Sequence, residues 1–347
     1  MTTLTITRPD DWHIHLRQGA ELAVTVDHAA KQFNRLVAMP NCIPPITDIK
    51  SALDYHHRIL QQTPDVYKKN FKPLIALYLT DQTSVDTIKQ ASINNNIIGV
   101  KLYPRGATTN SNNGVTDIFK LANVISAMEE YNLPLLVHGE VTDDNIDVFD
   151  RESVFIDTIL APLRSQFPKL KIILEHITTK DGVDFVLDNK KNTAATITPH
   201  HLLLNRNDLL VGGLKPHYYC LPIIKDHNNQ QAIIKAALSG LPCFFAGSDS
   251  APHKKASKES SYCPAGIYHG SKTTLVYTEF FDRHQKLDKL EAFLSFYGAD
   301  FYNLQRNAET ITLVKSQNII PEYYDYPNAE NKLIPFWAGK TLSWDFQ

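Results

Sequence analysis

Eight short runs of apolar and β-branched residues recur along the 347-residue chain, and helix-like segments separate most of them. The first run ends near His15, and the others span 35–41, 71–80, 97–104, 133–140, 170–178, 193–200 and 242–249. The runs are continuous rather than alternating, as in parallel strands that helices cover on both faces. Eight such strands predict an α/β fold, a (β/α)8 TIM barrel. A doubly wound sheet is the alternative, but no Gly-x-Gly-x-x-Gly follows any run.

The helix-like segments span 20–32, 51–62, 84–94, 115–130, 143–167 and 226–239, with two more at 271–282 and 287–297. Residues 305–347 are rich in Pro and Tyr and predict a C-terminal extension packed on the barrel. We find no internal repeat or linker, so we expect one domain over residues 1–347.

Composition and charge exclude several classes of protein. Lys plus Arg is 35 and Asp plus Glu is 37, and no basic block stands out, so we expect no nucleic-acid binding. No apolar run approaches the ~20 residues of a membrane span, and residues 1–8 do not resemble a signal peptide. The four cysteines are scattered without a Cys-x-x-Cys pair, which favours reduced thiols in a cytoplasmic protein; they are Cys42, Cys220, Cys243 and Cys263.

Unusual polar residues stand at the ends of the predicted strands, where barrel enzymes carry their catalytic groups. His13 and His15 share one face of an extended strand, and two imidazoles so placed can hold a transition metal. The alternative is a pair of half-buried polar residues. Further candidates end the later runs: Asn41, Lys101, His138, His176 and Asp249. Polar residues on an ordinary exposed surface would not be expected to recur at the ends of six predicted strands.

Lys101 follows an apolar run and is expected to point into a closed space, where an ammonium tends to lose its proton. The neutral amine could react with carbon dioxide to give an anionic carbamate able to bridge two metals. A lysine that reaches water is the equal alternative. Residues 106–114 form a small, polar loop bracketed by glycines, which is either a mobile lid or an inert turn.

Other histidines receive less definite interpretations. His200 and His201 end the seventh run, and since adjacent strand residues face opposite ways, at most one should enter the barrel. His217 and His269 fall in predicted loops, and the sequence assigns them no role.

Longer motifs resemble the dihydroorotases of the shorter bacterial type, within the amidohydrolase superfamily. They run from end to end as DDWHIHLR, MPNCIPPITD, GVKLYPRGATTNS, PLLVHGE, LEHITTKDGVDFV, ITPHHLLLNRNDLLVGGLKPHYYCLPIIK, AGSDSAPHKKASKESS and GKTLSW. The His-x-His pair marks only the superfamily. APH after the eighth run, ATTNS after the lysine and MPN after the second run point to the dihydroorotases themselves.

The resemblance implies a barrel of the metal-dependent hydrolase type and a reaction. That reaction is the reversible, zinc-dependent cyclisation of N-carbamoyl-L-aspartate to L-dihydroorotate, the third step of de novo pyrimidine (UMP) biosynthesis. It also implies a homodimer. Close relatives are expected to have glutamine where His200 stands, which argues against His200 being a ligand, and a more cysteine-rich segment at 261–266.

The resemblance further implies roles for individual residues. His13, His15 and Asp249 would hold the more buried zinc, and His138 and His176 the other. Lys101, as N6-carboxylysine, would bridge the two together with a hydroxide, and Asp249 would also carry the proton. The implied substrate contacts are Arg17, Asn41 and His253 to the carboxylate, the backbones of Leu221 and Ala265 to the ring amide, and Thr108 and Thr109 from the lid loop.

Two other readings fit part of these features. Another cyclic amidase, such as a hydantoinase or an allantoinase, would share the metals without needing Arg17, Asn41 and His253 around a carboxylate. A non-catalytic scaffold relative would keep the barrel, but such proteins usually lose metal ligands, and here the whole set is present.

Overall fold

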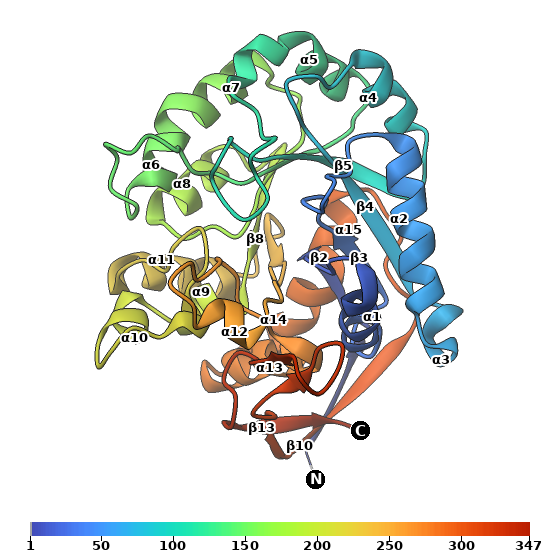
Figure 1. Ribbon diagram of the computed structural model, residues 1–347, viewed down its shortest axis with the longest axis vertical. Coiled ribbons are helices and arrows are strands. Elements are labelled where there is room, and N and C mark those ends of the chain that lie inside the picture. Colours follow the sequence, from blue (N-terminus) through green and yellow to red (C-terminus); the bar gives the residue numbers. More distant parts are fainter. Residues whose placement is uncertain (1) are drawn as a thin grey trace.

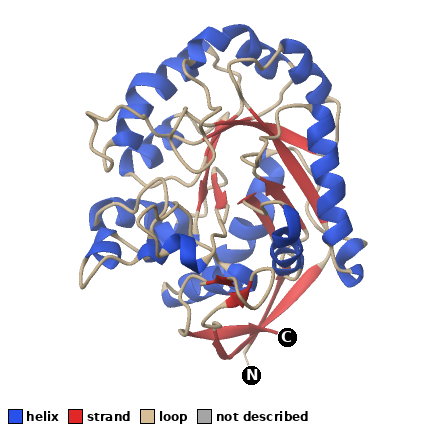
Figure 2. Ribbon diagram, in the orientation of Figure 1, coloured by secondary structure: helices blue, strands red, loops and turns tan. Residues whose placement is uncertain are grey.

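A computed structural model describes residues 2–347 and contains a parallel eight-stranded sheet in the order β2-β3-β4-β5-β6-β7-β8-β9 (Figures 1 and 2). Its strands are β2 (Asp10–Ile14), β3 (Arg35–Ala38), β4 (Lys72–Tyr78), β5 (Ile97–Leu102), β6 (Leu135–Val137), β7 (Ile172–Leu174), β8 (Thr193–Ile197) and β9 (Phe244–Ala246). Each strand lies in or beside one of the eight predicted runs. The predicted (β/α)8 barrel is therefore confirmed, and the doubly wound alternative is wrong.

The first and last strands meet just beyond their carboxyl ends. Ile14 and Ser250 form a parallel bridge, and the backbone N–H of His15 donates to the Ser250 carbonyl at 3.1 Å. The N–H of Asp249 donates to the His13 carbonyl at 2.8 Å. These bonds close the barrel and bring residues more than two hundred positions apart to one rim.

Helices form the outer layer of the barrel, as Figure 2 shows in blue. They are α1 (Leu22–Ala30), α2 (Ile49–Gln62), α3 (Asp65–Lys68), α4 (Val85–Ser92), α5 (Ala122–Glu130), α6 (Arg151–Phe155), α7 (Ala161–Gln166), α8 (Lys180–Asp188), α9 (Pro199–Leu203), α10 (Arg206–Leu210), α11 (His227–Leu238), α12 (Lys255–Lys258), α13 (Thr273–Arg283), α14 (Leu287–Glu291) and α15 (Tyr297–Phe301). A π-helical turn at Ile156–Leu160 joins α6 to α7, and another at Ala292–Phe296 joins α14 to α15.

Two predicted helices begin too early. The segment predicted as a helix over 143–167 is loop until Arg151, because Asp143 and Asp147 accept hydrogen bonds from backbone N–H groups two residues on and so favour turns. The helix predicted from residue 115 begins with a 3-10 turn at Ile118, after Asp117 caps it.

The interior of the barrel is filled with side chains. Trp12 is fully buried there and stacks on Tyr302 with ring centroids 4.8 Å apart. α15 packs against β2 and β9, and the ammonium of Lys171, just before β7, donates to the Phe301 carbonyl. The end of the helical layer therefore closes the amino-terminal side of the barrel and leaves the carboxyl-terminal side for chemistry.

The two ends of the chain share a second sheet, with order β1-β10-β13 and antiparallel pairing. Its strands are β1 (Thr3–Thr7), β10 (Thr310–Ile319) and β13 (Thr341–Phe346); a short pair, β11 (Tyr324–Asp325) and β12 (Lys332–Leu333), lies between the last two. β13 contacts α13, where Glu279 accepts a hydrogen bond from the Ser343 N–H at 2.8 Å. The C-terminal segment thus lies against the helical layer. Within residues 2–347, no helix is long and apolar enough to cross a membrane.

Candidate active site

The carboxyl-terminal mouth of the barrel holds a cluster of buried nitrogen and oxygen donors. His13 lies in β2, His15 follows it, and Asp249 follows β9. Asp249 Oδ1 lies 3.0 Å from His15 Nε2 and 3.4 Å from His13 Nε2. Each of the three residues has a ligand atom within 4.8 Å of those of the other two. Such a set can hold a metal ion.

Two further imidazoles continue this cluster. His138 directly follows β6, and His176 lies two residues after β7. The ring centroids of His13 and His176 are 4.9 Å apart, as are those of His176 and His138. The structure therefore brings together all four histidines that the sequence analysis selected, in one connected group.

Lys101 projects into the same space from β5. It is fully buried, and its Nζ has no hydrogen-bond partner within residues 2–347. Burial lowers the pKa of this ammonium to about 8, although the carboxylates of Glu175 and Asp249 oppose the shift. The lysine does not reach solvent, so the alternative of a snorkelling side chain is wrong.

Polar residues behind the histidines fix which nitrogen of each ring faces the cluster. Glu175 Oε2 lies 2.8 Å from His13 Nδ1, Glu140 Oε2 lies 2.7 Å from His138 Nε2, and Asn41 Oδ1 lies 2.8 Å from His15 Nδ1. An acceptor on one ring nitrogen holds the N–H there and leaves the opposite lone pair free for a metal. The sequence analysis missed Glu175 and Glu140, although a glutamate at the end of a buried strand signals a buried partner.

Burial also sets the charges of the cluster. It lowers the pKa of His13 and His176 well below the ordinary value, so both rings are neutral and can act as ligands. Burial opposes the ionisation of Asp249, but the hydrogen bond with His15 and the nearby imidazoles lower its pKa to about 2. Burial raises the pKa of Glu175 to about 7.

Three residues of the site have left-handed backbone conformations, with φ of 64° at Arg17, 42° at His176 and 47° at Asp249. This region is unfavourable for residues other than glycine by about 1–3 kcal/mol. Such strain is concentrated at functional sites, and here it directs the side chains of His176 and Asp249 into the cluster.

One side of the cavity carries the groups expected to bind a substrate. Arg17, Asn41, Leu221, Ala265, Thr108 and Thr109 line it together with His13, His15, His138, His176 and Asp249. His253 lies behind this wall: its Nε2 is 3.1 Å from Arg17 Nη2 and 2.9 Å from the Ala265 carbonyl. The structure thus brings every sequence-predicted site residue to one end of the barrel.

The loop over residues 106–114 lies across this cavity. Thr109 Oγ1 donates to the Ala265 carbonyl at 3.2 Å, and Asn41 Nδ2 donates to the Thr109 carbonyl at 3.0 Å. Asn110 Nδ2 donates in turn to the Asn41 carbonyl at 3.0 Å. These bonds hold the loop against the mouth of the barrel rather than away from it.

The prediction that His200 and His201 lie at the end of a strand is wrong. The strand ends at Ile197, and both residues lie in α9, where Thr198 caps the helix and Pro199 occupies its first turn. Both rings are buried, and His200 Nδ1 lies 3.0 Å from Nε2 of His269. His217 pairs with Glu259 at 3.1 Å, outside the cluster.

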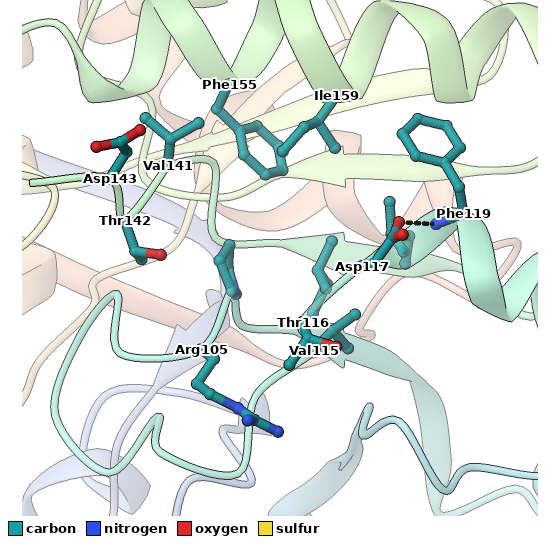
Figure 3. Close-up of a pocket in the computed structure, with 13 residues that line it drawn as sticks. Arg105, Val115, Thr116, Asp117, Phe119, Val141, Thr142, Asp143, Phe155 and Ile159 are labelled. Carbon is teal, nitrogen blue, oxygen red and sulfur yellow. Dashed lines mark hydrogen bonds between the residues drawn. The ribbon is translucent and has the colours of Figure 1, made fainter. Parts of the chain in front are cut away.

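A second cavity lies beside the loop over residues 106–114, and Figure 3 shows the residues that line it. Phe155, Ile159, Val141 and Val115 point into it, with Arg105 at its edge. Among residues 2–347, those that line it include no histidine or cysteine. This cavity lacks the donor set of the barrel mouth, so it is not the candidate active site.

Comparison with known proteins identifies the family. The pattern of the amidohydrolase family matches residues 6–321. The chain is 52% identical over 344 residues to a dihydroorotase of Acinetobacter baumannii, covering 99% of each. The chain belongs to the dihydroorotase family. A dihydroorotase of Idiomarina loihiensis is 53% identical over the same length, with 99% of each covered. The family assignment makes the protein a hydrolase of cyclic amides, and its His and Asp cluster is a candidate metal site.

Solved structures agree with the dihydroorotase family. A dihydroorotase of Saccharomyces cerevisiae, in complex with 5-fluoroorotic acid, superposes with a TM-score of 0.92 at 32% identity, covering 100% of this chain and 99% of that one. The enzyme of Campylobacter jejuni gives 0.90 at 36% identity, covering 99% and 97%. An L-hydantoinase of Arthrobacter aurescens gives 0.78 at 15% identity, covering 99% and 83%, so it shares the fold alone.

Proposed function

We propose that this dihydroorotase-family protein interconverts N-carbamoyl-L-aspartate and L-dihydroorotate at the mouth of its barrel, as a step of pyrimidine biosynthesis. The observation that carries this proposal is the convergence of two kinds of group on one cavity. Four imidazoles, the Asp249 carboxylate and the buried Lys101 amine meet there, and Arg17 and Asn41 line the same cavity. A hydantoinase or an allantoinase would not need Arg17 and Asn41 for a substrate carboxylate.

The residues at the barrel mouth fit two zinc ions. Three buried atoms of the proposed metal ligands lack a hydrogen-bond partner within residues 2–347, namely His13 Nε2, His176 Nδ1 and Lys101 Nζ. Neutral imidazole and carboxylate are ordinary zinc ligands. In the proposal, His13, His15 and Asp249 hold one ion, and His138 and His176 hold the other.

Lys101 would bridge the two ions as a carbamate. Its pKa of about 8 leaves a fraction of neutral amine near pH 7, and only the neutral amine reacts with carbon dioxide. The amine releases a proton as its nitrogen forms a bond to the carbon, and the product, N6-carboxylysine, is an anion with two oxygens that would be available to the ions. It would also relieve the burial of an unpartnered cation beside metals.

Two zinc ions, when bound, would supply Lewis acidity that polarises the ring carbonyl and brings the pKa of a water towards neutrality. Asp249 would then accept the proton of the attacking water and deliver it to the leaving ring nitrogen. In the direction of ring closure, the same carboxylate would take the proton from the ureido nitrogen. Its low pKa keeps it ionised and ready to accept that proton.

The substrate carboxylate would be bound by Arg17, Asn41 and His253. A guanidinium can bind both oxygens of a carboxylate through its planar fork. The backbones of Leu221 and Ala265 would contact the ring amide, and Thr108 and Thr109 would contact the substrate from the loop. All of these except His253 line the cavity, and His253 contacts Arg17.

The proposal extends to the state of the protein in the cell. The described thiols are free, which fits a cytoplasmic protein. We propose a homodimer from the family resemblance, to be measured by sedimentation. We also propose a single domain over residues 1–347, because the extension at 305–347 contacts α13 through Ser343 and Glu279.

Turnover with three substrates tests the function. We expect rapid ring opening of L-dihydroorotate and little or none of hydantoin or allantoin, with about two zinc ions per chain bound at the barrel mouth. Asp249→Asn should fold as the wild type and lose about 10²–10⁴-fold in kcat, as expected for a general acid–base group. Near-normal turnover by this variant would remove the proton-carrying role, and preference for hydantoin would overturn the substrate assignment.

A further inference from the structure

A second group of potential metal ligands lies outside the proposed active-site set. It consists of His200 and His201 in α9 and Cys220 in the loop that follows α10. Each has a ligand atom within 4.8 Å of the ligand atoms of the other two. The exposed fractions of the three residues are 0%, 3% and 1%, so these donors are shielded from solvent.

The distances among His201, Cys220 and the Pro222 carbonyl are close to those of a tetrahedral site. Cys220 Sγ lies 3.7 Å from His201 Nε2. The Pro222 carbonyl oxygen lies 3.0 Å from that nitrogen and 3.4 Å from the sulfur. In a tetrahedral zinc site, with bonds of about 2.0 Å to nitrogen and 2.3 Å to sulfur, the two ligand atoms lie roughly 3.5 Å apart.

His200 presents an unsatisfied nitrogen. Its Nδ1 is engaged with Nε2 of His269, whereas its Nε2 is buried and has no partner within residues 2–347. A buried polar atom without a partner is unfavourable by about 1–3 kcal/mol. A hydrogen bond from His201 to the Pro222 carbonyl can satisfy His201 without a metal, but it leaves His200 Nε2 unexplained.

We propose that His200, His201 and Cys220 form an additional binding site for a thiophilic divalent cation of the zinc type. The Pro222 carbonyl oxygen is the fourth donor. Binding exchanges one proton for the cation: the Cys220 thiol becomes a thiolate, the S–H proton leaves to solvent, and a sulfur–metal bond forms without redox change. Burial keeps both imidazoles neutral, since it lowers the pKa of His200 well below its ordinary value and that of His201 to about 4.

This site adjoins the proposed substrate pocket without sharing a ligand with the proposed metal centre. Leu221, which lies between Cys220 and Pro222, lines the cavity at the barrel mouth. His269, whose Nε2 lies 3.0 Å from His200 Nδ1, donates its backbone N–H to Ser250 Oγ at 3.0 Å. A cation held here would therefore fix the backbone of Leu221 beside the substrate.

Cobalt titration of the purified holoenzyme tests the proposal. The proposed active-site ligands contain no sulfur, so a thiolate-to-cobalt charge-transfer band reports only on a cysteine site. We expect wild-type protein to bind one more equivalent of Co²⁺ than the Cys220→Ser variant, and to show the band. Cys42→Ser and Cys263→Ser are matched controls, a buried and a half-exposed cysteine, and both should retain the band.

A second variant removes a different ligand. His200→Gln should lose the additional equivalent and the charge-transfer band while all four cysteines remain. It also keeps the proposal testable if Cys220→Ser does not fold. Absence of the band in wild-type protein, its survival in His200→Gln, or its loss in Cys263→Ser instead of Cys220→Ser would overturn the proposal. None of these outcomes depends on turnover of dihydroorotate.

Discussion

The Glu175→Gln variant tests the residue that positions His13 and leaves this proposed metal ligand itself unchanged. Glu175 Oε2 lies 2.8 Å from His13 Nδ1 and accepts a hydrogen bond from Thr196 Oγ1 at 2.6 Å. A glutamine oxygen in the same place keeps both contacts but removes the negative charge that the carboxylate carries above a pKa of about 7. Its amide nitrogen would occupy the place of Glu175 Oε1, which is buried and has no partner within residues 2–347.

The expected effect follows from these contacts. Hydrogen bonds to charged groups contribute about 1.5–3 kcal/mol and neutral ones about 0.5–1.5, so the His13 contact weakens by about 1–2 kcal/mol. Loss of a partner behind a metal-binding histidine typically lowers metal affinity 10–100-fold. We therefore expect the variant to bind zinc about tenfold or more weakly, with the change confined to the ion that His13 holds.

Competition with a chelator measures this effect, through the zinc retained at each chelator concentration. Glu152→Gln is the matched control, because Glu152 is also a buried glutamate, and it accepts hydrogen bonds from the backbone and hydroxyl groups of Thr178 and Thr179. That variant should unfold more easily but retain zinc as the wild type does. Unchanged zinc affinity in Glu175→Gln, or an equal loss in both variants, would refute the reasoning.

Three other changes have defined expectations. Arg17→Gln should raise KM for dihydroorotate about 10–100-fold, since a charged hydrogen bond contributes about 1.5–3 kcal/mol, with unchanged zinc content; equal loss of zinc would contradict the assignment. Gly298→Ala should lower the free energy of unfolding in urea by about 1–3 kcal/mol, because the added Cβ would lie 2.0 Å from Nε1 of Trp12. Lys89→Ala, at an exposed position of α4, should have little effect. Burial lowers the pKa of His28 to about 4 from 6.5, so the unfolded chain takes up the proton first and stability is lost as pH falls through this range, by at most about 3 kcal/mol. His28→Gln should remove this part of the pH dependence. If the urea midpoints of the variant and the wild type change equally with pH, His28 does not contribute to it.

The barrel could be predicted because its strands are continuous apolar runs, which few other folds require. The site could be predicted because a barrel gathers strand ends at one rim, so His13, His138 and Asp249 meet despite their separation in sequence. The predictions of the barrel and of the site both follow from the order of the strands and do not depend on side-chain contacts.

Other features depend on information that local patterns do not carry. β1 pairs with β10 across about three hundred residues, and its short Thr-rich alternation does not name a partner. Thr198 and Pro199 are a recognisable helix start. The apolar run before them outweighs this signal and predicts a strand at His200. The sequence around Glu175 does not show that its carboxylate faces the ring of His13, which lies more than one hundred and sixty positions away.

The side-chain amide of Asn41 makes two hydrogen bonds: its oxygen accepts from the His15 ring, and its nitrogen donates to the Thr109 carbonyl. Asn41 therefore couples the orientation of a proposed metal ligand to the position of the loop that lies across the cavity. A substitution at this one amide is expected to disturb both the ring and the loop, although Asn41 itself need not touch a metal.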